Sequence, residues 1–285
     1  MEEIRLQPPS AEVADLLSAY LRERVIPHPI LSPFLRDAAV CVAGAAASGD
    51  WDEEGELDVR WVLPEEDHAR LSAALREARL WDPARDFRLV IQDREPFRRF
   101  PATEMKILSA AQLVQEFRFD LPVTLWVYTH AAVLEDPSGL LESTTQGFAE
   151  RFQARLPDLQ CEHYFRFRQA RNDLTPKVMP RRLATVLAIK RGEAVQEALR
   201  LAFLADGLPY PHDRWLEPMA ERATRCGAGI ITAVRALVAA REAHTVERAG
   251  KVLRDRVAFA LQQGGVSERW LEQWWLWPGI APTVE

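Results

Sequence analysis

Residues 40–63, VCVAGAAASGDWDEEGELDVRWVL, decide how this chain is interpreted. The stretch begins as an apolar strand, breaks at Gly44, passes through an acidic loop and ends as a second strand. Glu56 and Asp58 occupy alternate positions of that second strand, so we expect their carboxylates to point to one face. Because neighbouring like charges repel, a fold tolerates this arrangement best when a cation sits between the two carboxylates.

The composition limits the classes of protein to consider. The chain has 285 residues, 48% hydrophobic and 27% charged, which is typical of a soluble protein with two domains. No apolar run approaches the roughly 20 residues of a membrane span, and the N-terminal MEEIRLQPPSAEV lacks the features of a secretory signal. We therefore expect a cytoplasmic protein without a membrane partner. The net charge of -6 also argues against DNA as a partner.

The cysteines predict neither a disulfide framework nor a zinc site. Cys41, Cys161 and Cys226 are far apart, odd in number and not at the spacing of metal ligands. We expect all three to be reduced thiols in the core or half-buried.

Hydrophobic periodicity predicts an α/β domain with a mixed sheet over residues 1–145 and an all-α domain over residues 146–285. The pattern changes after Gly139, where strand-like alternation almost disappears. In the first part, the predicted helices lie at residues 10–25, 65–80 and 109–117. The predicted strands lie at residues 38–44, 56–63, 87–93 and 103–108, with a fifth strand or strand pair at 123–136.

The motif Gly44-Ala45, followed ten residues later by Glu56-Leu57-Asp58 and the apolar VRWVL, resembles the nucleotidyltransferase fold of the DNA polymerase beta superfamily. The resemblance implies that Glu56 and Asp58 bind Mg²⁺, which prefers oxygen ligands and the oxygens of a nucleoside triphosphate. It also implies that the turn at Gly44 brings backbone N–H groups to the phosphates.

A third acid completes such sites, and Glu104 is the candidate. The segment TEMKILSAAQLVQEF, residues 103–117, resembles the part of aminoglycoside nucleotidyltransferases in which a strand glutamate precedes a helix. The resemblance implies that Glu104 is the general base that takes the proton of the acceptor hydroxyl. A role as a third metal ligand remains the alternative, and an exposed residue paired with Lys106 is another.

Two further segments resemble an uncharacterised nucleotidyltransferase-like family, the domain of unknown function numbered 4037. They are LWVYTHAAVLEDPSGLLE, residues 125–142, and EALRLAFLADGLPYPHDRWLEPMAE, residues 197–221. With the motifs above, the resemblance spans roughly residues 36–225. The order of the segments is more specific than any one of them.

The phosphate-binding residues are less well defined. Ala45 stands where the family has a turn serine, and Ser48 is a candidate to supply the missing hydroxyl. Lys190, Arg200 and Arg214 are candidates to hold the triphosphate, since guanidinium groups match phosphate oxygens. In a chain this rich in arginine, a surface position is the competing interpretation for each of them.

The sequence thus predicts a Mg²⁺-dependent enzyme that moves a nucleoside monophosphate from a nucleoside triphosphate, ATP being expected, to a hydroxyl acceptor. A small-molecule acceptor is favoured over a protein or an RNA. Two alternatives stay open. The paired acids are the exposed end of an edge strand, or the chain is a nucleotide-binding or interaction module that has lost catalysis.

Overall fold

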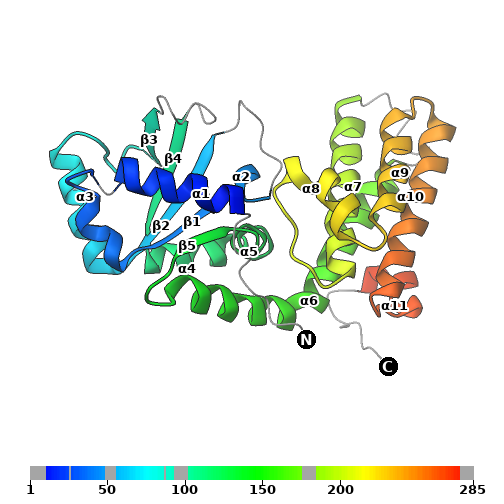
Figure 1. Ribbon diagram of the computed structural model, residues 1–285. Coiled ribbons are helices and arrows are strands. Elements are labelled where there is room, and N and C mark those ends of the chain that lie inside the picture. The colour runs from blue at the N-terminus through cyan, green and yellow to red at the C-terminus, as the bar shows by residue number, and fades with distance from the viewer. Residues whose placement is uncertain are drawn as a thin grey trace. The chain divides into compact units, whose positions relative to one another are not determined.

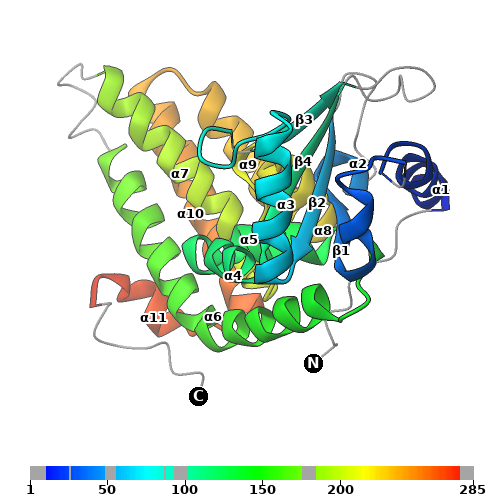
Figure 2. The ribbon, with the colours of Figure 1, turned by 90° about the vertical axis from the view of Figure 1, so that its left-hand side faces the viewer.

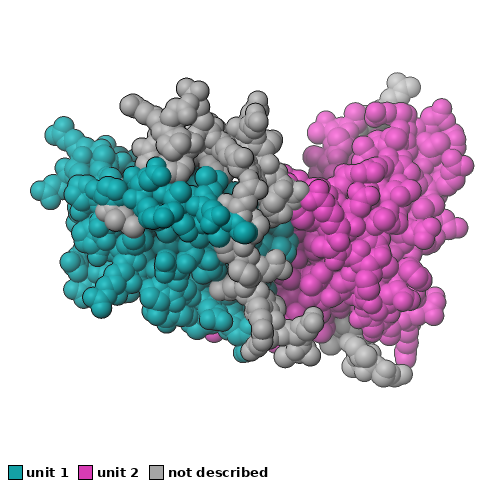
Figure 3. Space-filling view, viewed as in Figure 1, with its two compact units in different colours: residues 1–150 teal, residues 151–285 magenta. Residues whose placement is uncertain are grey.

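The computed structural model describes residues 11–25, 27–48, 56–86, 88–92, 102–174 and 184–276. The chain divides into two compact units, residues 1–150 and residues 151–285, which Figure 3 colours separately. The boundary expected near residue 145 falls within helix α6 (Leu140–Asp173).

The first unit is built on a five-stranded mixed sheet in the order β3-β4-β2-β1-β5 (Figure 1). Strands β2 and β4 are parallel, and the other neighbouring pairs are antiparallel. The strands are β1 (Ala39–Ala43), β2 (Leu57–Leu63), β3 (Leu89–Gln92), β4 (Ala102–Ser109) and β5 (Ala132–Glu135). This sheet, followed by a helical region, confirms the predicted fold class.

The two faces of the sheet are covered by different helices. One face is apolar and packs against α1 (Ala11–Tyr20), the 3-10 helix η2 (Ser32–Asp37) and α3 (Glu65–Glu77), with Trp61 and Met105 fully buried. Helices α4 (Ala110–Phe119) and α5 (Leu121–Thr129) lie on the other side of the sheet from α1, as Figure 2 shows. The π-helical turn η1 (Leu21–Val25) extends α1, and α2 (Ala45–Ser48) follows β1.

The prediction of a strand or strand pair over residues 123–136 is wrong in its first half. Residues 121–129 form α5, and only Ala132–Glu135 forms a strand. The Asp120 side chain caps this helix by accepting a hydrogen bond from the Val123 N–H at 3.4 Å. Most of α5 is buried, and a helix that is apolar on every side has no amphipathic periodicity that would separate it from a strand.

The second unit is helical throughout its described residues, as the sequence predicts. Helix α7 (Ala184–Ala205) packs against α8 (Asp213–Ala223), α9 (Gly227–Ala239) and α10 (Ala243–Gln263). The chain continues with α11 (Glu268–Glu272) and the 3-10 helix η4 (Trp274–Leu276). Within the described ranges, we find no helix with the length and apolar character needed to cross a membrane.

The three cysteines are free thiols, as expected, and two of them are fully buried. Burial raises the pKa of Cys41 to about 12 and also raises the pKa of Cys161 to about 12. Since the thiolate is the reactive form, both groups are protonated and unreactive at neutral pH. Cys226 is only half-buried.

We therefore predict that iodoacetamide at pH 8 alkylates Cys226 in the folded protein and leaves Cys41 and Cys161 unmodified. Peptide mass mapping measures the extent at each cysteine. In urea all three thiols should react, which is the control. Rapid modification of Cys41 under native conditions contradicts its place in the sheet.

Candidate active site

Asp58 and Glu104 are directly opposite each other in the parallel pairing of β2 with β4. Opposed residues of neighbouring strands point to the same face, so the sheet brings two of the three predicted acids together. Their side chains are 26% and 20% exposed, although Glu104 Oε2 itself is buried, so the pair is partly open to solvent. This acidic pair is the centre of the candidate site.

The cation that lies between these two carboxylates is the guanidinium group of Arg88. Arg88, which immediately precedes β3, places Nη1 3.1 Å from Asp58 Oδ1 and also pairs with Glu104 Oε2. The sequence alone did not identify Arg88 as a residue of the site. Its one signal is its position in FRLVIQD, two residues before Val90, which pairs with Glu104 in the antiparallel β3–β4 ladder.

The turn at Gly44 lies against the same carboxylate. Gly44 follows β1 with a φ of 72°, a left-handed conformation that only glycine adopts without strain. A Cβ atom at this position would lie 2.6 Å from Asp58 Oδ2. The glycine is thus required both by the backbone and by the close approach of Asp58, which agrees with its place in the motif.

The other predicted residues of this motif are Glu56, Ala45 and Ser48, and no third acidic side chain joins Asp58 and Glu104 among the described residues. Glu56 is exposed and directly precedes β2. No group of three or more His, Cys, Asp or Glu side chains suited to a metal ion occurs among the residues that the structure describes. Ala45 and Ser48 are the first and last residues of α2, and a phosphate contact for either stays a prediction.

A second polar cluster lies on the same two strands, two residues after Asp58 and Glu104. Arg60 is opposite Lys106, and both basic groups pair with Glu116 of α4. The Tyr128 hydroxyl donates to Glu116 Oε2 at 3.0 Å and accepts from Arg60 Nη1 at 3.2 Å. Burial lowers the pKa of Lys106, against the opposing effect of Glu116. The three charged side chains are only 14–19% exposed and pair with one another, which indicates a structural role.

The predicted phosphate ligand Lys190 lies in the second unit and has acidic partners there. Its Nζ lies 2.8 Å from Glu193 Oε2 and 3.7 Å from Asp173 Oδ2. Arg214 is exposed, and its guanidinium carbon lies 5.7 Å from the centre of the Trp215 ring. Neither contact indicates a phosphate site.

Arg200 belongs to a buried network in the same unit. It contacts Glu197 at 3.4 Å and Asp213 at 3.1 Å. Glu197 lies 2.5 Å from Nδ1 of His163, and the hydroxyl of Tyr210 lies 3.1 Å from Nε2 of the same ring. Tyr210, which lies in the segment 197–221 quoted above, therefore connects the loop before α8 to α6 and α7 through His163 and Glu197.

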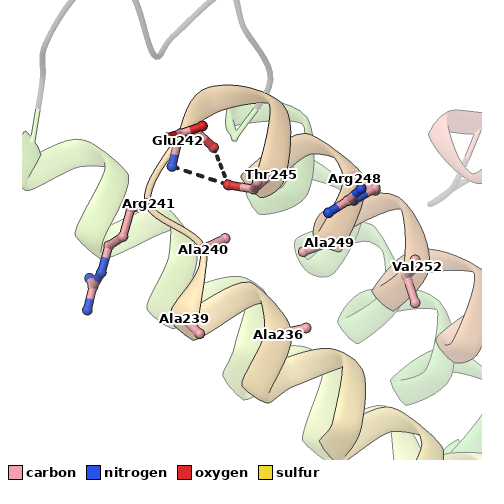
Figure 4. A pocket seen from close by; sticks show the side chains of 9 residues that line it. All are labelled: Ala236, Ala239, Ala240, Arg241, Glu242, Thr245, Arg248, Ala249 and Val252. Atoms are coloured by element: carbon pink, nitrogen blue, oxygen red, sulfur yellow. Dashed lines mark hydrogen bonds between the residues drawn. The ribbon is translucent and has the colours of Figure 1, made fainter.

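A separate open cavity of about 530 Å³ lies where α9 meets α10 (Figure 4). Its wall is made largely of small side chains, and Glu242 and Thr245 bond to each other at the connection. The lining residues are Ala236, Ala239, Ala240, Arg241, Glu242, Thr245, Arg248, Ala249 and Val252. None of the predicted site residues lines it.

Comparisons with known proteins identify a distant structural neighbour. No family model and no curated protein sequence matches this chain. The crystal structure of a nucleotidyltransferase-like protein from Exiguobacterium sibiricum aligns with a TM-score of 0.42 and 10% identity, over 88% of this chain and 77% of that chain. This neighbour does not support the finer resemblance to the domain of unknown function 4037 or to aminoglycoside enzymes.

We predict that Gly44→Ala lowers the free energy of unfolding by at least about 1 kcal/mol, the usual penalty for a left-handed non-glycine residue. The added Cβ also displaces the Asp58 carboxylate. Urea denaturation measures the change. The matched control is Gly192→Ala, in the open middle of α7, where nothing lies within 4 Å and alanine should be neutral or stabilising. Equal effects of the two substitutions contradict the close approach at Gly44.

Proposed function

We propose that this protein transfers a nucleoside monophosphate from a nucleoside triphosphate, with ATP the expected donor, to a hydroxyl group of an acceptor. The observation that supports this proposal best is the pairing of Asp58 with Glu104 across two parallel strands, beside the left-handed turn at Gly44. Two neighbouring carboxylates suit a divalent metal ion and a glycine turn suits a phosphate, and nucleotidyl transfer uses both.

The donor atoms at the site fit Mg²⁺, the proposed cofactor. Asp58 and Glu104 offer carboxylate oxygens, which Mg²⁺ prefers, and the two already share one cation in Arg88. Glu56, two residues before Asp58, is the proposed third ligand. Bound Mg²⁺ supplies stabilisation of the negative charge on the attacking and leaving oxygens at the α-phosphate.

The residues of the chain have separate roles in this proposal. The Gly44 turn donates backbone N–H groups to the phosphates, and Glu104 accepts the proton of the acceptor hydroxyl. The hydroxyl oxygen forms a bond to the α-phosphorus while the bond to the bridging oxygen breaks, and pyrophosphate leaves. Asp58 lies against Gly44, so its carboxylate would hold the metal ion close to the phosphates at the turn.

The rest of the triphosphate needs contacts of its own. Ala45 offers no hydroxyl, so Ser48 or backbone N–H groups would serve in its place. Lys190, Arg200 and Arg214 remain candidates, although Lys190 and Arg200 would have to exchange acidic partners for phosphate oxygens. Breaking these ion pairs costs free energy, so a basic group that already lies beside Asp58 and Glu104 is better suited to bind the triphosphate.

The proposed acceptor is a small molecule, because an acidic protein attracts a cationic aminoalcohol and repels the phosphates of RNA. The net charge of -6 supports this preference, and we propose neither DNA nor a membrane as a partner.

The second candidate is a nucleotide-binding or interaction protein of the same fold without transferase activity. One observation favours it: Arg88 already offsets the charge of the acidic pair, so the pair is stable without a metal ion. Release of pyrophosphate separates the two candidates, because only the enzyme produces it.

We predict that wild-type protein, supplied with Mg²⁺ and each of the four labelled triphosphates, transfers label to an acceptor and releases pyrophosphate. The acceptors to test are aminoalcohols, proteins and RNA. Asp58→Ala should abolish transfer, whereas Asp67→Ala, an acid of α3 paired with Arg70, should leave it unchanged. A wild-type protein that releases no pyrophosphate with any acceptor contradicts the enzyme and favours the second candidate.

The role of Glu104 needs a second variant. Glu104→Gln should lower transfer by about 10²–10⁴-fold, the usual loss when a general base is removed. If Glu104 is only a base, Mn²⁺ affinity should change little, whereas loss of a metal ligand weakens Mn²⁺ binding together with the rate. The control is Glu66→Gln, at an exposed position in the first turn of α3.

A further inference from the structure

Arg88 lies where its charge opposes a metal ion at the acidic pair. A single guanidinium nitrogen, Nη1, contacts both Asp58 Oδ1 and Glu104 Oε2. A guanidinium and a divalent cation in contact with the same two carboxylates would repel each other strongly, because the separation is only a few ångströms. The two cations therefore exclude each other at these oxygens.

The position of Arg88 allows it to leave. Its side chain is 33% exposed and that of Asp58 is 26% exposed, so water reaches the guanidinium and the Asp58 carboxylate, whereas Glu104 Oε2 is buried. Water competes for the charges of a partly exposed ion pair, which makes it weaker than a fully buried one. The guanidinium stands on a long side chain with several rotatable bonds, so it can move away while the backbone before β3 stays in place.

A nucleoside triphosphate offers the guanidinium a better partner. Phosphate oxygens match the two-pronged geometry of arginine, and the Gly44 turn would hold the phosphates beside Asp58. Once Arg88 bonds to phosphate, both carboxylates become available to a metal ion. The same movement thus removes a competitor and adds a phosphate ligand.

We infer that Arg88 is an exchangeable counter-ion that blocks the acidic pair against divalent metal until a nucleoside triphosphate draws its guanidinium away. This inference rests on the proposed function and deepens it by assigning a positioning residue to the site. Metal alone then binds weakly, and metal and nucleotide strengthen each other's binding by the same factor.

The first test measures Mn²⁺ binding without nucleotide, by electron paramagnetic resonance of the free ion. Arg88→Gln should bind Mn²⁺ about tenfold more tightly than wild type, because the competing charge is gone. Arg88→Lys keeps the charge and should remain weak. Arg85→Gln is the matched control, because Arg85 is exposed, close in sequence and paired with Asp82. Equal Mn²⁺ affinity in wild type and Arg88→Gln overturns the inference.

The second test adds a non-hydrolysable ATP analogue to the same titrations. Mn²⁺ affinity should rise markedly in wild type and in Arg85→Gln, whereas Arg88→Gln should lose most of this coupling. Coupling that survives in Arg88→Gln overturns the inference, because another group then links the two ligands. So does a failure of every variant to bind Mn²⁺.

These readouts are independent of catalysis. If Mn²⁺ binding changes as expected but no acceptor is labelled, the inference about Arg88 holds and the proposed transfer fails. If transfer occurs and the Mn²⁺ affinities of wild type and Arg88→Gln are equal, the transferase is supported and the counter-ion role is rejected.

Discussion

Like charges stand side by side on the parallel strands β2 and β4, and this constraint governs the first unit. Asp58 is opposite Glu104, and two residues further along the same face of these strands Arg60 is opposite Lys106. Directly opposed like charges destabilise a sheet unless opposite charges reach them from elsewhere. Arg88 supplies that charge to the acidic row, and Glu116 of α4 supplies it to the basic row. The pairing of the central strands therefore depends on two groups outside those strands.

The two rows differ in what surrounds them, and this difference locates the candidate chemistry. The basic row is enclosed by α4 and α5, where Tyr128 and Glu116 complete its hydrogen bonds. The acidic row is somewhat more exposed, at 26% for Asp58 and 20% for Glu104 against 14–19% for the side chains of the basic cluster. The left-handed turn at Gly44 lies beside Asp58 and has no side chain of its own. Charge that is stabilised but still accessible suits a ligand-binding site better than charge that is enclosed.

The second unit uses its charged groups differently. Arg200 and Glu197 belong to a network with His163 and Tyr210 that connects α6, α7 and the loop before α8. Buried polar groups bonded in this way fix the packing of helices. The arginine there that matched a phosphate ligand by residue type has two carboxylate partners, Glu197 and Asp213, within its own unit. Residue type alone does not distinguish these two roles, because an arginine suits a carboxylate as well as a phosphate.

The sequence by itself determined features that depend on near neighbours: the break at Gly44, the strand that carries Asp58, and the helical character of the described residues after Gly139. Alternation and helical periodicity are local patterns, so they are readable without the fold. Periodicity failed at residues 121–129, because a helix buried on all sides loses its polar stripe. Glu104 was found through a family resemblance, but its alignment with Asp58 is set by strand register. Only the tertiary structure revealed Arg88, since its contact with Asp58 joins residues thirty positions apart through the pairing of β3, β4 and β2, which no local pattern encodes.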